Sequence, residues 1–293
     1  MKTKILLDTD IGTDVDDAIC LAYLLANPNC ELVGITTVTG ESEKRAMLAS
    51  SLCKIAGKNI PTYPGIENPL KIEQLQKKAQ QAKALNKWSH DKVFPKYEAI
   101  NFMRRIIREN PGEIVLLTIG PLTNIGVLFS IDHEIPSLLK GLVTMAGKFD
   151  LNAPAYSNVE WNAMGDYHAT EIVYRANVPF HKSIGIDISS RVTMDSNEFK
   201  KICNHKLLMP VLDFSKIWFE EWDVITFHDP LAAALIFNDS ICKFEKGLVT
   251  IELEKEKERG LTHWFPKSEI KKHEVAVDVN KEKFFEEYLS VFK

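Results

Sequence analysis

The stretch that decides the fold is Ile5-Leu6-Leu7-Asp8-Thr9-Asp10-Ile11-Gly12-Thr13-Asp14-Val15-Asp16-Asp17-Ala18. Its first three residues form a short apolar run, which predicts a buried strand. A loop with five carboxylates follows, and residues 18–25 then show a helical apolar pattern. A strand that leads through a polar loop into a helix is the first unit expected of a parallel α/β sheet.

Strand and helix patterns alternate along the rest of the chain. Apolar runs predict strands at 32–38, 114–119, 142–146 and 180–188, and periodic patterns predict helices at 44–55, 97–108 and 231–237. We therefore predict an α/β protein: a single domain over residues 1–293, with an open, mostly parallel (mixed) sheet flanked by helices. Ligands of such sheets bind where the carboxyl ends of the strands meet.

Composition narrows the possible functions. The formal charge of −4 argues against a nucleic-acid binder that relies on bulk electrostatics and leaves small-molecule substrates open. The five cysteines are odd in number and widely spaced, so we expect neither a disulfide framework nor a zinc site, and a cytoplasmic location fits. We expect no signal peptide in the first ten residues, MKTKILLDTD, and no membrane-spanning run.

The acidic loop calls for a neutralising partner. No lysine or arginine lies within it, and unpaired carboxylates in a partly desolvated site would repel one another. A divalent cation is the simplest solution, and all-oxygen ligands favour calcium or magnesium. The alternative is a solvated acidic turn in which Asp14 or Asp16 caps the following helix.

Two other acidic patterns fit less well. The spacing is not that of an EF-hand loop. A magnesium-dependent phosphatase would need threonine or valine in place of Gly12 and a later acidic pair after a strand. Gly165-Asp166 is the only candidate for that pair, so the phosphatase remains a weaker alternative.

The acidic loop resembles the DxDxGxDDA signature of the inosine-uridine nucleoside hydrolases. Five further segments resemble motifs of that family in the same order: Gly120-Pro121-Leu122-Thr123-Asn124, Val143-Thr144-Met145-Ala146-Gly147, Glu160-Trp161-Asn162 with Asp166, Gly185-Ile186-Asp187-Ile188, and Phe227-His228-Asp229-Pro230-Leu231-Ala232. The ordered set covers nearly the whole chain. It implies a Rossmann-like nucleoside hydrolase fold and calcium-dependent cleavage of ribonucleosides into ribose and a free base.

The resemblance also implies roles for single residues. Calcium would be bound by Asp10, Asp17, the backbone carbonyl of Thr123 and Asp229, with Asp10 also acting as general base towards a water. The ribose hydroxyls would be held by Asp16, Asn162, Asp229 and Glu160, and Met145 would line the sugar pocket. His228 would protonate or polarise the leaving base. The family suggests a homodimer or homotetramer.

These roles are chemically coherent. Cleavage of an N-glycosidic bond builds positive charge on the sugar, which neighbouring carboxylates stabilise. The departing base carries negative charge, which an acid such as histidine can quench. No partner other than a small nucleoside is required, and neither nucleic acid nor membrane is expected.

The chain departs from the family pattern in several places. Two extra residues stand between Gly12 and the aspartate pair, which we align to Asp16 and Asp17; the competing alignment uses Asp14 instead of Asp16. Glu41 stands where the family commonly has asparagine. Asn158 is a candidate sugar contact, although its spacing from Glu160 is unusual.

Other residues admit two interpretations. Without the motif, His228 would be expected to be structural. His90 could contact the base or simply lie in the polar segment 71–96, which predicts an exposed helix or a mobile flap. Trp218, Phe219 and Trp222 could pack in the core or stack on a base. A catalytically weak nucleoside- or sugar-binding protein is the alternative function from another class.

Overall fold

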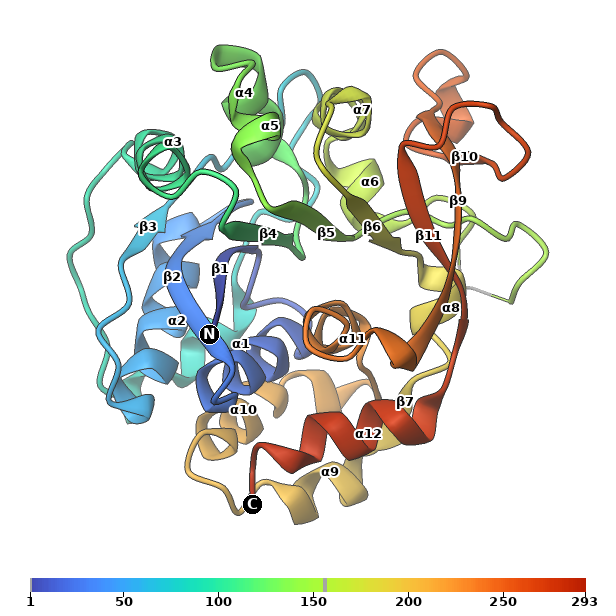
Figure 1. The fold of residues 1–293 in the computed structure, drawn as a ribbon. Helices are drawn as coiled ribbons and strands as arrows, with labels where there is room; N and C mark the ends of the chain where they lie inside the picture. Colours follow the sequence, from blue (N-terminus) through green and yellow to red (C-terminus); the bar gives the residue numbers. More distant parts are fainter. Residues whose placement is uncertain (1, 155–156) are drawn as a thin grey trace.

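The computed structural model describes residues 2–154 and 157–293 (Figure 1). Within these residues, nine strands form one sheet in the order β10-β9-β11-β6-β5-β4-β1-β2-β3, and β7 and β8 pair separately. The strands are β1 (Thr3–Thr9), β2 (Cys30–Thr37), β3 (Thr62–Pro64), β4 (Ile114–Thr118), β5 (Gly141–Met145), β6 (His181–Ile184), β7 (Thr193–Asp195), β8 (Val224–Thr226), β9 (Cys242–Ile251), β10 (Thr262–Phe265) and β11 (His273–Val279).

Seven neighbouring strands of the large sheet, from β11 to β3, run parallel. Only β9 and β10 run antiparallel to their neighbours. This confirms the open, mostly parallel sheet expected from the alternating sequence pattern. The charged stretch between β9 and β10 is the exposed connection of a hairpin, with a short 3₁₀ turn, η4 (Glu256–Glu258).

Helices cover both faces of the sheet (Figure 1). On one face lie α1 (Asp16–Ala26), α2 (Ser42–Ala56), α9 (Ser196–Ile202), α10 (Leu208–Ser215), α11 (His228–Ala234) and α12 (Lys281–Ser290); on the other lie α3 (Ala99–Glu109), α4 (Thr123–Ile131), α5 (Ile135–Leu138) and α7 (Tyr167–Arg175). Short elements complete the chain: α6 (Trp161–Gly165), α8 (Ile186–Ser189), η1 (Gln80–Lys87), η2 (Trp218–Glu220) and η3 (Asp239–Ile241).

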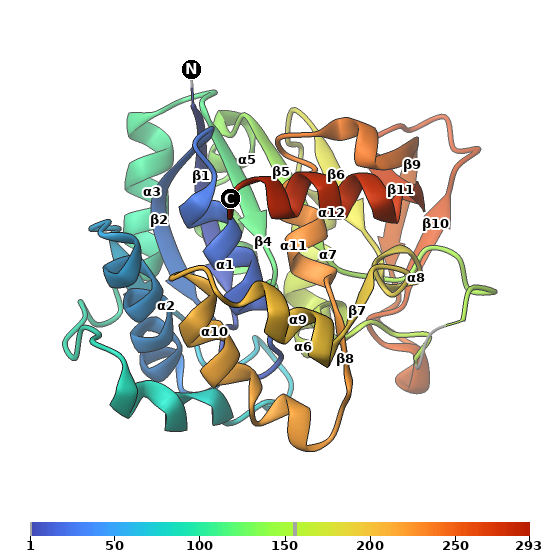
Figure 2. The same cartoon turned by 90° about the horizontal axis from the view of Figure 1, so that it is seen from below.

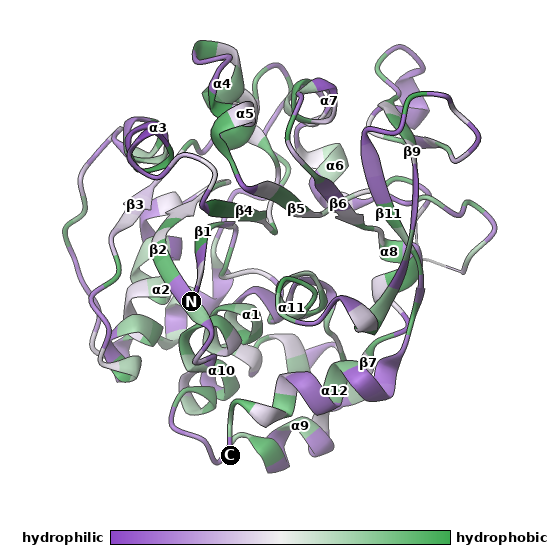
Figure 3. Ribbon diagram, in the orientation of Figure 1, coloured by the Kyte–Doolittle hydropathy of each residue, from purple (hydrophilic) through white to green (hydrophobic). Residues whose placement is uncertain are grey.

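Two apolar cores result, one on each face. Ile5 and Leu7 belong to the first and Leu6 to the second, as strand alternation requires. The central strands are therefore apolar on both sides, whereas polar residues lie on the outer faces of the helices (Figure 3).

The helix α12 lies beside α11 (Figure 2). The ring of Tyr288 stacks on that of Tyr23 in α1, with centroids 5.7 Å apart, and Phe284 meets Phe227, the residue that precedes α11. The Tyr23 hydroxyl also donates a 2.8 Å hydrogen bond to Glu287. Residues near the end of the chain thus brace the helices that begin at the acidic loop and at His228.

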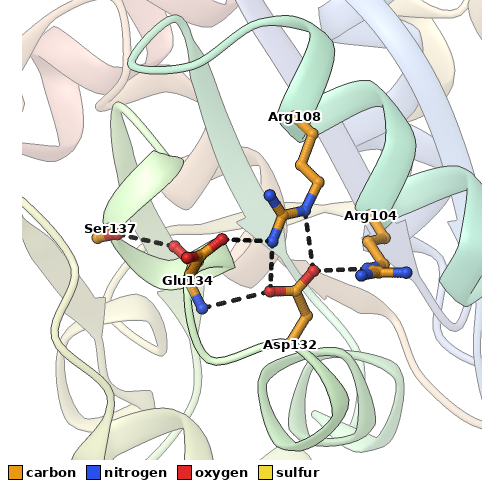
Figure 4. A network of polar contacts seen from close by, with 5 residues as sticks. All are labelled: Arg104, Arg108, Asp132, Glu134 and Ser137. Atoms are coloured by element: carbon orange, nitrogen blue, oxygen red, sulfur yellow. Dashed lines mark hydrogen bonds and ion pairs between the residues drawn. The ribbon is translucent and has the colours of Figure 1, made fainter.

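An ion-pair network around the buried carboxylate of Asp132 joins α3 to the turn after α4 at the protein surface (Figure 4). Arg108 forms a two-point contact with the Asp132 carboxylate, with bonds of 2.9 and 2.7 Å, and Arg104 also donates to it. Glu134 accepts a further bond from Arg108. The Arg108 and Arg104 hydrogen bonds outweigh the effect of burial and hold the pKa of Asp132 well below its usual range.

Three sequence expectations differ from the structure. The run 180–188 is a strand only to Ile184, because Gly185 turns the chain into α8, where the Asp187 carboxylate accepts from the N–H of Phe149. The helix expected from Tyr97 begins at Ala99, since Tyr97 has a φ of 60° and lies fully exposed. The helix expected at 231–237 begins earlier, at His228, and ends at Ala234.

All five cysteines are buried and unpaired, as expected. Among the residues that the structure describes, none of the helices combines the length and apolar character needed to cross a bilayer.

Candidate active site

The acidic loop and the second half of the chain meet at the carboxyl edge of the sheet. Asp10 follows β1, Thr123 opens α4 after β4, and Met145 ends β5. The helices α1 and α11 pack against each other, and their first turns carry Asp16, Asp17 and Asp229.

Three of these carboxylates converge. Asp16, Asp17 and Asp229 each offer one oxygen, and these oxygens lie within 4.8 Å of one another. All three side chains are buried. The N–H of Asp229 donates a 3.1 Å bond to Oδ2 of Asp16, and Thr9 donates its hydroxyl hydrogen to Oδ1 of Asp17. The cluster is therefore a preformed group of carboxylate oxygens that could hold a cation.

Burial and mutual repulsion make this cluster electrostatically unfavourable when it is ionised. Burial, together with the charges of Asp10 and Asp16, raises the pKa of Asp17 well above its usual range. Burial and the neighbouring aspartates do the same to the pKa of Asp229. A divalent cation would reverse these shifts, because it favours the ionised carboxylates.

The residues present fit a hard cation, since every donor in the cluster is an oxygen. Asp10 is not a member of this group of three within residues 2–154 and 157–293, but its carboxylate is buried and burial raises its pKa to about 6. A solvated turn does not describe Asp16 and Asp17, because both side chains are buried. Val15 holds the cap position of α1, and the Asp14 carboxylate accepts from the N–H of Val15.

Glu160, Asn162 and Met145 lie together beside the end of β5. The Glu160 carboxylate caps α6 by accepting from the N–H groups of Asn162 and Ala163, and it also accepts from that of Gly147 at 2.9 Å. Burial raises its pKa to about 7. The Asn162 amide donates to the carbonyl of Met145 at 3.0 Å. These bonds fix the side chains of Glu160 and Asn162, to which the family resemblance gives sugar contacts.

Asn158 is exposed, unlike the residues of this group. Its Oδ1 accepts a 2.9 Å bond from the ammonium of Lys148, which is buried. The predicted sugar contact of Asn158 therefore competes with an existing partner.

His228 is half-buried at the start of α11. Its Nδ1 lies 2.7 Å from the hydroxyl oxygen of Ser189 in α8, and burial lowers its pKa to about 4. The imidazole is therefore neutral near pH 7. A hydroxyl that donates to Nδ1 would leave the hydrogen on Nε2, so that Nε2 could donate to a leaving base.

Several supporting contacts were not evident from the sequence, although Asp8 and Asp166 lie in segments that resemble the family motifs. Asp166 accepts from the Thr123 hydroxyl at 2.8 Å, so the Thr123 side chain anchors the start of α4. Asp8 accepts from the Asn124 amide at 2.7 Å and fixes the same turn from β1. Arg45 reaches the acidic loop from α2, although no basic residue lies near that loop in sequence.

The structure also shows the contacts of Glu41 and of two residues whose sequence position admits two interpretations, His90 and Trp222. Glu41 points to the segment after residue 76, where it accepts from the N–H of Ala79, and forms an ion pair with Lys44. A ring nitrogen of His90 lies 2.7 Å from the carbonyl oxygen of Trp88. Trp222 is exposed and stacks with Trp218, so it is not a core residue.

The fold and the site together define the class of protein. It is an α/β protein whose buried carboxylates meet at the carboxyl edge of a parallel sheet. Gly165 ends α6 and Asp166 caps α7, so neither follows a strand as the acidic pair of a phosphatase would.

Comparison with known proteins narrows this class to a family. Residues 5–286 match the family model of the inosine-uridine preferring nucleoside hydrolases. Uridine nucleosidase 1 of Arabidopsis thaliana is 26% identical over 268 residues, which cover 85% of this chain and 78% of that protein. The chain therefore belongs to the inosine-uridine preferring nucleoside hydrolase family, whose members hydrolyse ribonucleosides.

Solved structures agree with this assignment at the level of the fold. A plant nucleoside hydrolase superposes with a TM-score of 0.88 at 21% identity and covers 100% of this chain and 99% of its own. A purine-preferring ribonucleoside hydrolase from Gardnerella vaginalis gives a TM-score of 0.85 at 22% identity, with 99% and 98% covered.

Proposed function

We propose that residues 1–293 act as one calcium-dependent nucleoside hydrolase domain, which releases the base from ribonucleosides. The observation that carries the choice of a hard cation is the convergence of Asp16, Asp17 and Asp229. The proposed ligands are Asp10, Asp17, the Thr123 carbonyl and Asp229. When bound, calcium would lower the pKa of a water and orient it.

The protein residues then carry the chemistry. Asp10 accepts the proton of the attacking water. Asp16 accepts from the 2′-hydroxyl, Asn162 and Asp229 hold the 3′-hydroxyl, and Glu160 holds the 5′-hydroxyl. The nearby carboxylates stabilise the positive charge that develops on the sugar. His228 donates a hydrogen bond from Nε2 to the departing base.

The location and assembly are also proposals. Five unpaired, buried cysteines fit a reducing cytoplasm. A homodimer or homotetramer is proposed from the family alone.

A substrate panel tests the proposed function. Inosine, uridine and other ribonucleosides are incubated with the protein after calcium removal by EGTA and again after calcium or magnesium is returned. We expect base release that needs calcium. Undiminished release after thorough chelation would contradict the metal assignment, and binding without release would favour the catalytically weak alternative.

A further inference from the structure

Two buried side chains hold the backbone of the acidic loop from outside. Arg45 Nη1 donates to the carbonyls of Asp10 and Ile11. The backbone N–H of Gln81 donates to the carbonyl of Gly12 at 3.0 Å. The side-chain amide of Gln81 donates to the next two carbonyls, those of Thr13 at 3.1 Å and Asp14 at 2.8 Å. Successive carbonyls from Asp10 to Asp14 are thus bonded to only two residues.

Neither side chain is placed there by an ion pair. Arg45 and Gln81 are fully buried. Within residues 2–154 and 157–293, Arg45 has no carboxylate partner in an ion pair, and its other bonds go to the carbonyls of Gly40 and Lys78 and to the Thr13 hydroxyl. A buried arginine whose N–H groups donate mainly to backbone carbonyls fixes the path of the chain around it.

Segment 78–81 is packed directly against the loop. Gly12 has a φ of 123°, and a Cβ at this position would lie 3.1 Å from that of Ala79. Arg45 bonds the Lys78 carbonyl at 3.3 Å, and Glu41 bonds the Ala79 N–H at 2.9 Å. The polar segment 71–96, for which the sequence indicates an exposed helix or a flap, is therefore held against the acidic loop at residues 78–81.

Two of the departures from the family pattern, the extra residues before Asp16 and Glu41, belong to this arrangement. The extra residues precede Asp16, and Gln81 binds the carbonyls of Thr13 and Asp14 within that stretch. Glu41, in place of the common asparagine, ties down the segment that carries Gln81. The enlarged loop and its support are therefore parts of one structure.

We propose that Arg45 and Gln81 are positioning residues that hold the enlarged acidic loop in its cation-binding shape, so that these two side chains set the cation affinity of the site. This inference rests on the proposed function. Loop carbonyls left without donors would let the loop relax and would spread the carboxylates of Asp10, Asp16 and Asp17. Residues that orient metal ligands in this way commonly change metal affinity by ~10–100-fold.

Gln81→Met tests the proposal, because it keeps the length of the side chain and removes both amide donors. The matched control is Gln80→Met, the same change at the exposed neighbouring residue. Calcium affinity of the full chain is measured by titration calorimetry, and unfolding is followed by heating in EGTA. We expect calcium to bind about 10-fold or more weakly to Gln81→Met and normally to Gln80→Met.

Milder variants keep the test informative if Gln81→Met does not fold. Gln81→Asn keeps the amide but shortens it, and Arg45→Lys keeps the charge but loses the fork of donors; both should weaken calcium binding. A lower melting temperature with unchanged calcium affinity in these variants would overturn the inference. Absence of calcium binding by the unmodified chain would instead overturn the proposed function.

Discussion

The backbone N–H of Asp229 donates a 3.1 Å hydrogen bond to Oδ2 of Asp16, which joins the first turns of α11 and α1. This contact places a carboxylate from late in the chain against the acidic loop. It also holds like charges together, because the charge of Asp16 adds to burial in raising the pKa of Asp229. The site therefore opposes the stability of the protein until a cation binds.

Asp229→Asn should separate stability from function. Loss of one buried like charge is expected to raise the melting temperature in EGTA by about 2–4 °C, equivalent to ~1 kcal/mol for a protein of this size. The same change should abolish base release and the stabilisation by calcium. Thermal unfolding with EGTA and with calcium measures both effects. Glu31→Gln, at an exposed site, is the control, and normal turnover of Asp229→Asn would refute the assignment.

Stability without metal should fall as the pH rises from 6.5 to 8. Burial raises the pKa of Asp14 and of Glu160 to about 7, so the folded protein holds protons that the unfolded chain has already released. Their stabilising contribution is lost as the pH passes through the folded pKa. The lowered pKa of His228 acts in the opposite sense, but below its unfolded pKa of ~6.5.

Melting temperatures in EGTA across this range test the prediction. Excess calcium should remove the decline, because the cation binds the ionised carboxylates more tightly as protons leave. A melting temperature that rises with pH in EGTA would show that the cluster does not bind protons in this way.

His228→Ala should slow natural nucleosides more than an activated substrate. The expected loss of kcat on inosine is ~100-fold, the usual contribution of a group that assists proton transfer. The rate on 4-nitrophenyl riboside should change little, because its leaving group needs no proton. Ser189→Ala should show a smaller loss on inosine, since the histidine remains but its Nδ1 partner is gone. Equal losses on both substrates would remove the leaving-group role.

Asp132→Asn should destabilise the fold without affecting turnover. The two arginines in Figure 4 hold the pKa of Asp132 below its usual range, so its contribution is present above the unfolded pKa and shrinks as the pH falls. We expect a loss of about 1 kcal/mol at pH 7, as for a networked surface ion pair, measured by urea unfolding. The difference from the unmodified chain should narrow at pH 3. Glu134→Gln, at the exposed end of the network, should cost less.

The local features of the site were predictable from the sequence. The apolar run 5–7 and the carboxylates after it predict a strand that ends in a ligand loop, and the structure has that order. The calcium assignment and the role of each side chain remain predictions.

The supports of the site were not predictable, because each comes from packing between distant segments. Arg45 and Gln81 reach the loop from α2 and η1, and neither has a spacing that points to it. The apolar run 180–188 predicts a strand where α8 forms, because its apolar residues suit either element and the turn depends on contacts of Asp187. Periodicity records which face of an element is apolar, not which distant polar group meets it.

The packing of α12 on α1 and α11 has a consequence for biosynthesis. A ribosome completes the acidic loop early, Asp229 much later, and the aromatic brace of Phe284 and Tyr288 after both. The ring contacts of Phe284 and Tyr288 therefore form only after α12 has left the exit tunnel, later than the synthesis of either group of carboxylates.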